Sequence, residues 1–269
     1  AAADVSPADE EIQISVMVHI GPRVVLGLLH PVVGAAVSLV RPQIPVPTPR
    51  AVLRRGRTVR GDRAGMAASG EEAGLALAGC TPLIDQDCRH ALVFDIGGGS
   101  TELIWVETVE GEEPRVLGWT SLACGVVTLT ERHGGHEISA AAYDDMVQYV
   151  SGLLHEFEAT HNIRAAIQAD KAHLLGTSGT VTTLAAVHLQ LPRYDRGRVD
   201  GTWIDVQALD EVAESLRGMT FEERAGHPCI RRARADLVVA GCAIMDAITG
   251  MWSMQRLRVA DRGLREGML

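Results

Sequence analysis

The sequence is poor in aromatic residues, contains almost no lysine, and lacks a long uninterrupted hydrophobic run. Aromatic side chains are 4% of its 269 residues, and Lys171 is its one lysine, so arginine carries nearly all of the basic charge. The formal net charge of -9 argues against a general nucleic-acid binder. The apolar segment 12–40 is broken by prolines and charged residues, so it is neither a signal peptide nor a membrane span of about 20 apolar residues. We therefore expect no nucleic-acid partner and no membrane association.

Cysteine is also scarce, and its spacing forms no motif. The five cysteines are Cys80, Cys88, Cys124, Cys229 and Cys242, and no two of them make a CxxC pair. An odd number of cysteines without such pairs, in a chain of this size, argues against a disulfide scaffold. We expect a reduced, cytoplasmic compartment in which these thiols are mostly small core residues.

The composition changes near residue 68. Residues 1–68 show no persistent helical or strand period, and four prolines between positions 42 and 49 deny backbone donors to any ladder. We expect residues 1–68 to be an unassigned leader, disordered or read from another frame. In residues 69–269 helical segments alternate with short β-rich runs, which predicts an α/β domain.

The hydrophobic periods in residues 69–269 predict a set of alternating elements. The first two strands are joined by a glycine turn and so form a hairpin, and Ser139 caps a helix with one apolar face. The other helices begin at Ser69, Thr182, Asp205 and Asp236. The predicted strands cover residues 91–94, 103–106, 116–122, 172–175 and 257–259.

The hairpin turn carries the strongest chemical signal, DIGGGSTE at residues 95–102. Three glycines remove every β-carbon where a phosphate must approach backbone N–H groups, and Asp95 and Glu102 bracket the loop with carboxylates that suit Mg²⁺. A Walker loop or dinucleotide fingerprint would lead into a helix, whereas a strand follows here. The structural alternative is a plain hairpin with a glycine bulge. The phosphate-binding candidates are Gly97, Gly98, Gly99, Ser100 and Thr101.

A second glycine turn, GTSGT at residues 176–180, follows a strand and opens a helix. The N-terminus of a helix presents free N–H groups and partial positive charge, which suit an anion. On its own this turn is equally typical of an ordinary strand-to-helix connection. Its candidate phosphate-binding residues are Gly176, Thr177, Gly179 and Thr180.

Several stretches, in order, resemble the exopolyphosphatase/guanosine pentaphosphate phosphatase family of the actin–Hsp70–hexokinase superfamily. The resemblance covers about residues 69–269 and implies an α/β, actin-like (ribonuclease H-like) ATPase-type lobe with a phosphate-binding hairpin. The stretches that carry it are 69–73 (SGEEA), 95–103, 125–131 (GVVTLTE), 176–184 (GTSGTVTTL), 234–241 and 261–269 (DRGLREGML).

The resemblance also implies a reaction. Glu72 matches the carboxylate that activates water against the terminal phosphorus, and Asp95 and Glu102 match the acids near Mg²⁺. The implied activity is release of terminal phosphate from inorganic polyphosphate or guanosine pentaphosphate, by a cytoplasmic enzyme that forms a homodimer in many family members. The sequence does not choose between the two substrates, because both present a terminal phosphoanhydride.

The chain departs from the family in its first part. The family's first phosphate loop, Asp-Leu-Gly-Ser-Asn, has no match in residues 1–68, and Gly74 replaces a usual arginine. Two alternatives therefore stay open: a catalytically impaired, truncated remnant, and a nucleotide-binding relative of the sugar and acetate kinases. With one phosphate loop we expect slow hydrolysis or none from the chain alone. The arginines at 231, 232 and 234 are either a solvated lead-in to a helix or a basic cluster that attracts a polyanion.

Overall fold

The computed structural model describes residues 17–20, 23–26, 74, 77–133, 137–169 and 171–262. Contacts divide the chain into two units, Ala1–Arg57 and Thr58–Leu269. In the first unit, β1 (Met17–Ile20) and β2 (Arg23–Leu26) pair as an antiparallel hairpin. The sequence did not predict this hairpin. The rest of residues 1–68 lies outside the described residues, so the assignment of that segment as a leader stays a prediction.

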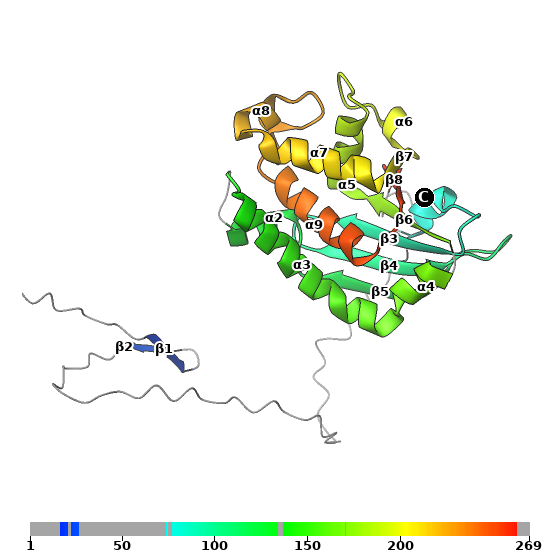
Figure 1. Ribbon diagram of the computed structural model, residues 1–269, viewed down its shortest axis with the longest axis horizontal. Coiled ribbons are helices and arrows are strands. Elements are labelled where there is room, and N and C mark those ends of the chain that lie inside the picture. Colours follow the sequence, from blue (N-terminus) through cyan, green and yellow to red (C-terminus); the bar gives the residue numbers. More distant parts are fainter. Residues whose placement is uncertain are drawn as a thin grey trace, which may run out of the picture. The chain divides into compact units, whose positions relative to one another are not determined.

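The second unit is built on a six-stranded mixed sheet with the strand order β5-β4-β3-β6-β8-β7 (Figure 1). In this sheet β3, β4 and β5 form an antiparallel meander. On the other side of β3, β6 pairs with it in parallel and β8 pairs in parallel with β6. At the edge, β7 pairs antiparallel with β8. The strands are β3 (His90–Ile96), β4 (Thr101–Glu107), β5 (Arg115–Leu122), β6 (Ala172–Thr177), β7 (Trp203–Asp205) and β8 (Arg256–Ala260).

Helices cover the sheet and complete the α/β fold. On one face α3 packs against the almost wholly buried α9, and α5 and α7 lie beside them (Figure 1). Ser139 caps α3 as predicted, since its hydroxyl accepts a hydrogen bond from the N–H of Ala142. The helices are α2 (Val126–His133), α3 (Ala140–His161), α4 (Ile163–Ala169), α5 (Ser178–His188), α6 (Arg196–Val199), α7 (Val206–Gly218), α8 (Phe221–Gly226) and α9 (Val238–Met251), with 3₁₀ turns η1 (Thr81–Leu83) and η2 (Arg232–Arg234).

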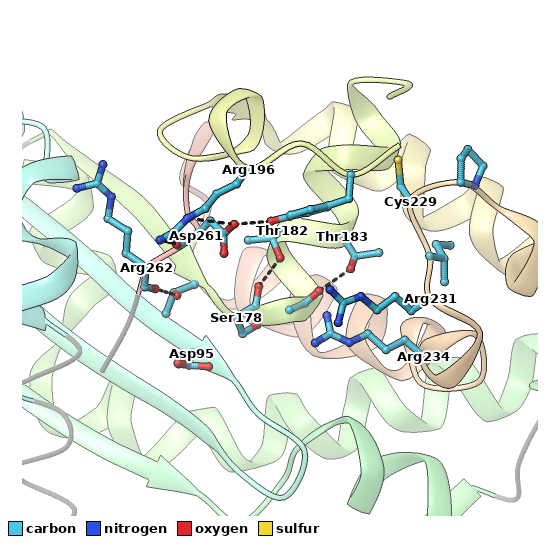
Figure 2. A pocket seen from close by; sticks show the side chains of 15 residues that line it. Asp95, Ser178, Thr182, Thr183, Arg196, Cys229, Arg231, Arg234, Asp261 and Arg262 are labelled. Carbon is cyan, nitrogen blue, oxygen red and sulfur yellow. Dashed lines mark hydrogen bonds and ion pairs between the residues drawn. The ribbon is translucent and has the colours of Figure 1, made fainter. Parts of the chain in front are cut away.

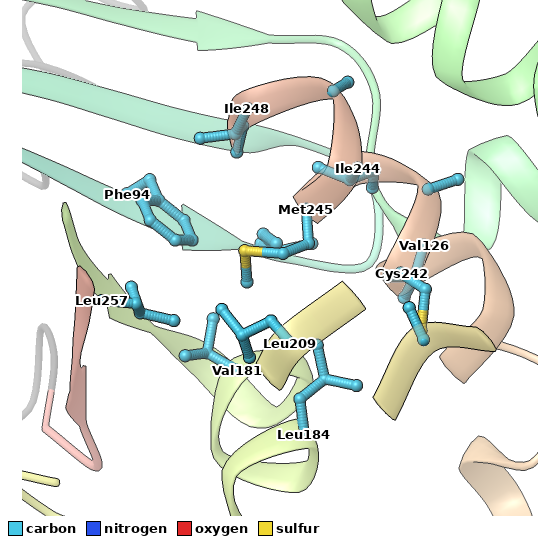
Figure 3. Close-up of a cluster of buried hydrophobic side chains, with 14 of the residues drawn as sticks. Phe94, Val126, Val181, Leu184, Leu209, Cys242, Ile244, Met245, Ile248 and Leu257 are labelled. Carbon is cyan, nitrogen blue, oxygen red and sulfur yellow. The ribbon is translucent and has the colours of Figure 1, made fainter. Parts of the chain in front are cut away.

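The main core lies between the sheet and these helices. Phe94 from β3 meets Val181 of α5, Met245 of α9 and Leu257 of β8 in one buried cluster (Figure 3). A smaller cluster covers the opposite face of the sheet, where Leu77, Cys80 and Leu83 pack against β3 and β4. All five cysteines are buried and none is in a disulfide, as the sequence predicted. In the part of the chain that the structure describes, no helix is both long and apolar enough to cross a membrane.

The predicted strands and long helices of residues 81–262 are confirmed, with shifted ends, whereas the start of the helix expected from Ser69 lies outside the described residues. The helix expected from Thr182 begins at Ser178, directly after β6, and the helix expected from Asp236 begins at Val238. The sequence missed β7, α2, α4, α6 and α8. These elements have eight residues or fewer, which is too short for a helical or strand period to stand out.

We predict opposite stability effects for the same substitution at two glycines. A β-carbon at Gly176 would lie 2.6 Å from Cζ of Phe94, inside the core, so Gly176→Ala should lower the free energy of unfolding by about 1–3 kcal/mol. Gly152 lies within α3 with open space around its missing β-carbon, so Gly152→Ala should raise that free energy by up to about 1 kcal/mol. Urea titrations of both variants and the parent measure these differences. A neutral Gly176→Ala would contradict the close packing of β6 on β3.

Candidate functional site

Strand β3 brings the two glycine turns together at one end of the sheet. Within the sheet Asp95 pairs with Glu102 of β4 on one side and with Thr177 of β6 on the other. Residues directly opposite one another in a sheet place their side chains on the same face. The carboxylates of Asp95 and Glu102 are therefore neighbours, next to the turn that opens α5.

The first glycine turn is anchored by the start of α2. The carbonyl oxygens of Gly97 and Gly98 accept hydrogen bonds from the N–H groups of Val126 and Val127, at 3.0 and 2.8 Å. Since the C=O and N–H of a trans peptide point in opposite directions, the N–H groups of Gly98 and Gly99 point away from α2. No acceptor for either N–H occurs in the described part of the chain. Both are thus available to an anion.

Three other residues predicted to bind phosphate have partners within the fold. Thr101 is 1% exposed, and its hydroxyl donates to the carbonyl of Cys124 at 2.7 Å. Thr177 is 3% exposed, and its hydroxyl donates to the carbonyl of Arg262. Gly176 is buried under Phe94. The structure therefore gives these three positions packing and hydrogen-bonding partners within the fold.

The second turn forms the strained start of α5. Ser178 has a φ of +99°, a region that non-glycine residues seldom adopt and that costs about 1–3 kcal/mol. Its hydroxyl accepts a hydrogen bond from the N–H of Thr180 at 3.2 Å. A β-carbon at Gly179 would lie 2.0 Å from Nη1 of Arg234, so only glycine lets this guanidinium lie against the helix start.

Two adjoining cavities, of about 700 and 410 Å³, open beside these turns. Asp95, Ser178, Gly179, Thr183 and Arg234 line both, so the cavities form one cleft. Figure 2 shows the carboxylate of Asp95 on one side of the larger cavity and the guanidinium groups of Arg231 and Arg234 on the other. Pairing an acidic wall with a basic wall suits a phosphate that is bound together with a cation.

The three arginines of the basic cluster have separate roles in the structure. Arg232 turns outward and binds Glu222 through two hydrogen bonds of 3.0 and 2.9 Å. Arg231 and Arg234 line the larger cavity, and within the described residues neither forms an ion pair. Arg231 and Arg234 are three residues apart, and the outward-facing Arg232 lies between them. This spacing is the sequence signal that could have assigned Arg231 and Arg234 to the cleft.

The acidic wall fits a cation that it shares with a bound phosphate. Burial, and next the nearby Glu102, raise the pKa of Asp95 from its ordinary 3.8 to about 6. Glu102 accepts a hydrogen bond from the Ser121 hydroxyl at 2.8 Å. No group of three or more potential metal ligands occurs among the described residues. The two carboxylates fit Mg²⁺, which often binds through one or two carboxylates and the oxygens of its substrate.

Glu72 lies outside the described residues, as do positions 263–269. Gly74 and residues 77–80, which follow it, are helical, and Leu77 and Cys80 pack on the face of the sheet to which Asp95 belongs. The roles predicted for Glu72 and for residues 263–269 therefore stay predictions.

The mixed sheet, with a glycine-rich hairpin turn and a second glycine turn at one end, is that of an actin-like ATPase lobe. A Ppx/GppA family structure from Aquifex aeolicus has 24% identity and a TM-score of 0.63, covering 74% of this chain and 60% of that one. An exopolyphosphatase structure from Cytophaga hutchinsonii has 24% identity and a TM-score of 0.62, covering 74% and 61%. Both solved structures thus share the fold predicted from the sequence.

The sequence model of the Ppx/GppA phosphatase family matches residues 61–269, and the chain belongs to that family. Exopolyphosphatase 2 of Mycobacterium tuberculosis is 28% identical over 203 residues, which are 72% of this chain and 57% of the relative. The chain thus spans less than two thirds of the length of these relatives. The family is one of phosphatases, which gives the kinase alternative no support.

We predict that Asp95 makes the fold less stable as the pH rises. Between about pH 4 and about pH 6, Asp95 keeps its proton in the folded protein but loses it in the unfolded chain. The free energy of unfolding therefore falls as the pH rises through this range. Asp95→Asn removes this loss and should be more stable than the parent above about pH 7, by up to about 3 kcal/mol.

Urea titrations at about pH 4 and about pH 7.5 measure this difference. The gain of Asp95→Asn over the parent should be small at the lower pH and larger at the higher one. Asp87→Asn, in an exposed turn, is the matched control and should behave like the parent. A gain of equal size at both pH values would contradict the buried, proton-holding carboxyl.

Proposed function

We propose that this chain carries the phosphate- and metal-binding part of a phosphohydrolase that releases terminal phosphate from polyphosphate or guanosine pentaphosphate. The observation that carries the proposal is the cleft that Gly98, Asp95 and the guanidinium groups of Arg231 and Arg234 line, with Glu102 opposite Asp95 in the sheet. A phosphoanhydride chain, its cation and an attacking water need those three kinds of group.

The phosphate side of the cleft combines fixed dipoles with charge. The N–H groups of Gly98 and Gly99 and the start of α5 at Gly179 supply donors that need no rearrangement. Arg231 and Arg234 add two positive charges without carboxylate partners in the described chain. Donors fixed before binding stabilise charge that develops on phosphate oxygens during transfer.

The acidic side of the cleft supports binding of the cation. Asp95 and Glu102 would hold Mg²⁺, which neutralises phosphate charge when bound. Without a cation, burial and mutual repulsion leave the pKa of Asp95 near 6. A bound cation would favour the ionised carboxylate, because an opposite charge lowers the pKa of an acid.

Water activation is assigned to Glu72 by the family resemblance. A general base must reach the attacking water, and a carboxylate beside the terminal phosphate meets that need. Helical residues 77–80, which follow Glu72 in the chain, pack on the face of the sheet that carries Asp95. That placement supports the assignment.

We predict Mg²⁺-dependent release of inorganic phosphate that depends on Glu72. Release should be slow in the chain alone and faster after an Asp-Leu-Gly-Ser-Asn phosphate-loop lobe is joined before Ser69, since a second loop completes the clamp. In that fusion, Glu72→Gln should lower turnover at least about a hundredfold, the scale of a lost general base. The assay follows phosphate released from polyphosphate and from guanosine pentaphosphate, with and without EDTA.

Glu131→Gln is the matched control in this assay, because Glu131 is an exposed residue of α2. Its turnover should equal that of the parent fusion. Equal turnover in Glu72→Gln, or release that persists in EDTA, would contradict the proposed function.

A further inference from the structure

Helix α2 begins with the motif GVVTLTE at residues 125–131, which the proposed chemistry does not use. The N–H groups in the first turn of a helix need acceptors, and a side chain of Ser, Thr, Asp or Asn at the preceding residue is the usual one. The residue before α2 is Gly125, which has no side chain to offer. The carbonyl oxygens of Gly97 and Gly98 accept hydrogen bonds from the first N–H groups of α2 instead. The glycine turn therefore caps this helix.

The contact between α2 and the turn requires glycine at position 125. A β-carbon at Gly125 would lie 2.5 Å from the carbonyl oxygens of Gly97 and Gly98, which are main-chain atoms and cannot turn aside. Among the described residues, a β-carbon at Gly99 would have no neighbour within 4 Å, and one at Gly98 would only touch Cγ2 of Val127 at 3.5 Å. Neither Gly98 nor Gly99 has a positive φ. Packing in the described chain thus demands glycine at 125 but not at 98 or 99.

The helix cap also acts on the N–H donors of the turn. Each carbonyl that bonds to α2 belongs to the same peptide group as the N–H of the next residue, Gly98 or Gly99. A hydrogen bond accepted by the C=O of a peptide polarises it and strengthens its N–H as a donor. Thr128 holds this end of α2, since its hydroxyl accepts from the N–H of Gly125 at 2.8 Å and donates to the Gly125 carbonyl at 3.0 Å. The start of α2 thus both places and strengthens these two donors.

The residues just before α2 contact the other end of the turn. The hydroxyl of Ser121, in β5, donates to Oε1 of Glu102 at 2.8 Å. The buried hydroxyl of Thr101 donates to the carbonyl of Cys124 at 2.7 Å. A hydrogen bond to a carboxylate that binds a metal fixes its orientation and supports the affinity for that metal. Residues 121–128 therefore hold the turn at both of its ends.

We infer that residues 121–128 are a positioning segment for the glycine turn, in which Gly125 places the N–H donors and Ser121 fixes the carboxylate of Glu102. This inference rests on the proposed function, which gives phosphate to the turn and a cation to Glu102. The residues that line the cleft include neither Gly125 nor Ser121, so each acts through another residue. The two contacts have separable effects, one on phosphate and one on the cation.

Calorimetry of tripolyphosphate binding to the full chain, in EDTA and in Mg²⁺, tests the contact at Gly125. Gly125→Ala should weaken binding about tenfold or more in both solutions, because the added methyl group displaces donors that bind phosphate without a cation. Gly152→Ala, which has open space in α3, is the matched control and should bind like the parent. In NMR spectra of glycine-labelled chain, tripolyphosphate should shift the amide signals of Gly98 and Gly99 in the parent but not in Gly125→Ala.

Thr128 offers a milder change that tests the same contact if Gly125→Ala does not fold. Thr128→Val removes the hydroxyl that holds Gly125 but keeps the shape of the side chain, and it should weaken tripolyphosphate about threefold in both solutions. Thr128→Ser keeps the hydroxyl and should bind like the parent. Thermal unfolding of each variant verifies that it is folded.

The contact at Ser121 is tested through the cation. Ser121→Ala should reduce the gain in tripolyphosphate affinity that Mg²⁺ confers by about tenfold, because Glu102 loses its hydrogen bond. The affinity in EDTA should stay within about twofold of the parent value, since no cation is bound there. Ser121→Thr keeps a hydroxyl and should restore the gain. Ser253→Ala, an exposed serine between α9 and β8, is the matched control and should bind like the parent in both solutions.

Parent-like binding by folded Gly125→Ala, or by Thr128→Val where Gly125→Ala does not fold, would overturn the positioning segment. So would a Mg²⁺ gain that Ser121→Ala leaves unchanged. Phosphate release by the fusion with the additional loop is measured separately. Absence of release together with weaker tripolyphosphate binding in Gly125→Ala would support the positioning segment and contradict the proposed function. Release together with parent-like binding in folded Gly125→Ala would do the reverse.

Discussion

The candidate site depends on the position of β3 in the sheet. Because β3 pairs with β4 on one side and β6 on the other, Asp95 stands opposite both Glu102 and Thr177. One turn returns along the sheet as a hairpin, and the other opens a helix across it. Their glycines therefore meet at one end of the sheet, although about 80 residues separate them in the chain.

Burial of β3 also creates the electrostatic character of the cleft. Six of its seven residues are buried, and Asp95 is the exception. A carboxyl at the end of a buried strand is partly removed from water, and a second carboxylate beside it opposes its ionisation. The same end of the sheet faces two guanidinium groups that have no acidic partner in the described chain. The proposed cation and phosphate would together balance these opposed charges.

The sequence predicts those parts of the fold whose signals are local. The apolar runs on either side of DIGGGSTE define the hairpin, and Ser139 marks the start of α3. Long-range packing decides the rest. The hydroxyls of Thr101 and Thr177 donate hydrogen bonds to the carbonyls of Cys124 and Arg262, which are distant in the sequence. The glycine motifs alone therefore do not show that these hydroxyls already have acceptors within the fold.

The same limit applies to the walls of the cleft. Arg231 and Arg234 face the cavity while Arg232 binds Glu222, a division that follows from the packing of η2 and not from composition. Tyr194 and Asp261 are far apart in the sequence, and only the fold brings the phenol to the carboxylate. Asp261 begins the stretch DRGLREGML, but Tyr194 belongs to no motif, so the sequence does not predict that the two side chains meet.

We propose that Asp95 is a half-buried acid that becomes ionised when it shares a cation with phosphate. Carbon-13 NMR of the aspartate carboxyl groups, with Asp95→Asn to assign the signal, follows this titration directly. We expect a midpoint at about pH 6 without a cation, and a lower midpoint once Mg²⁺ and tripolyphosphate are both present. A midpoint near the ordinary value of 3.8, or one that Mg²⁺ and tripolyphosphate leave unchanged, would contradict it.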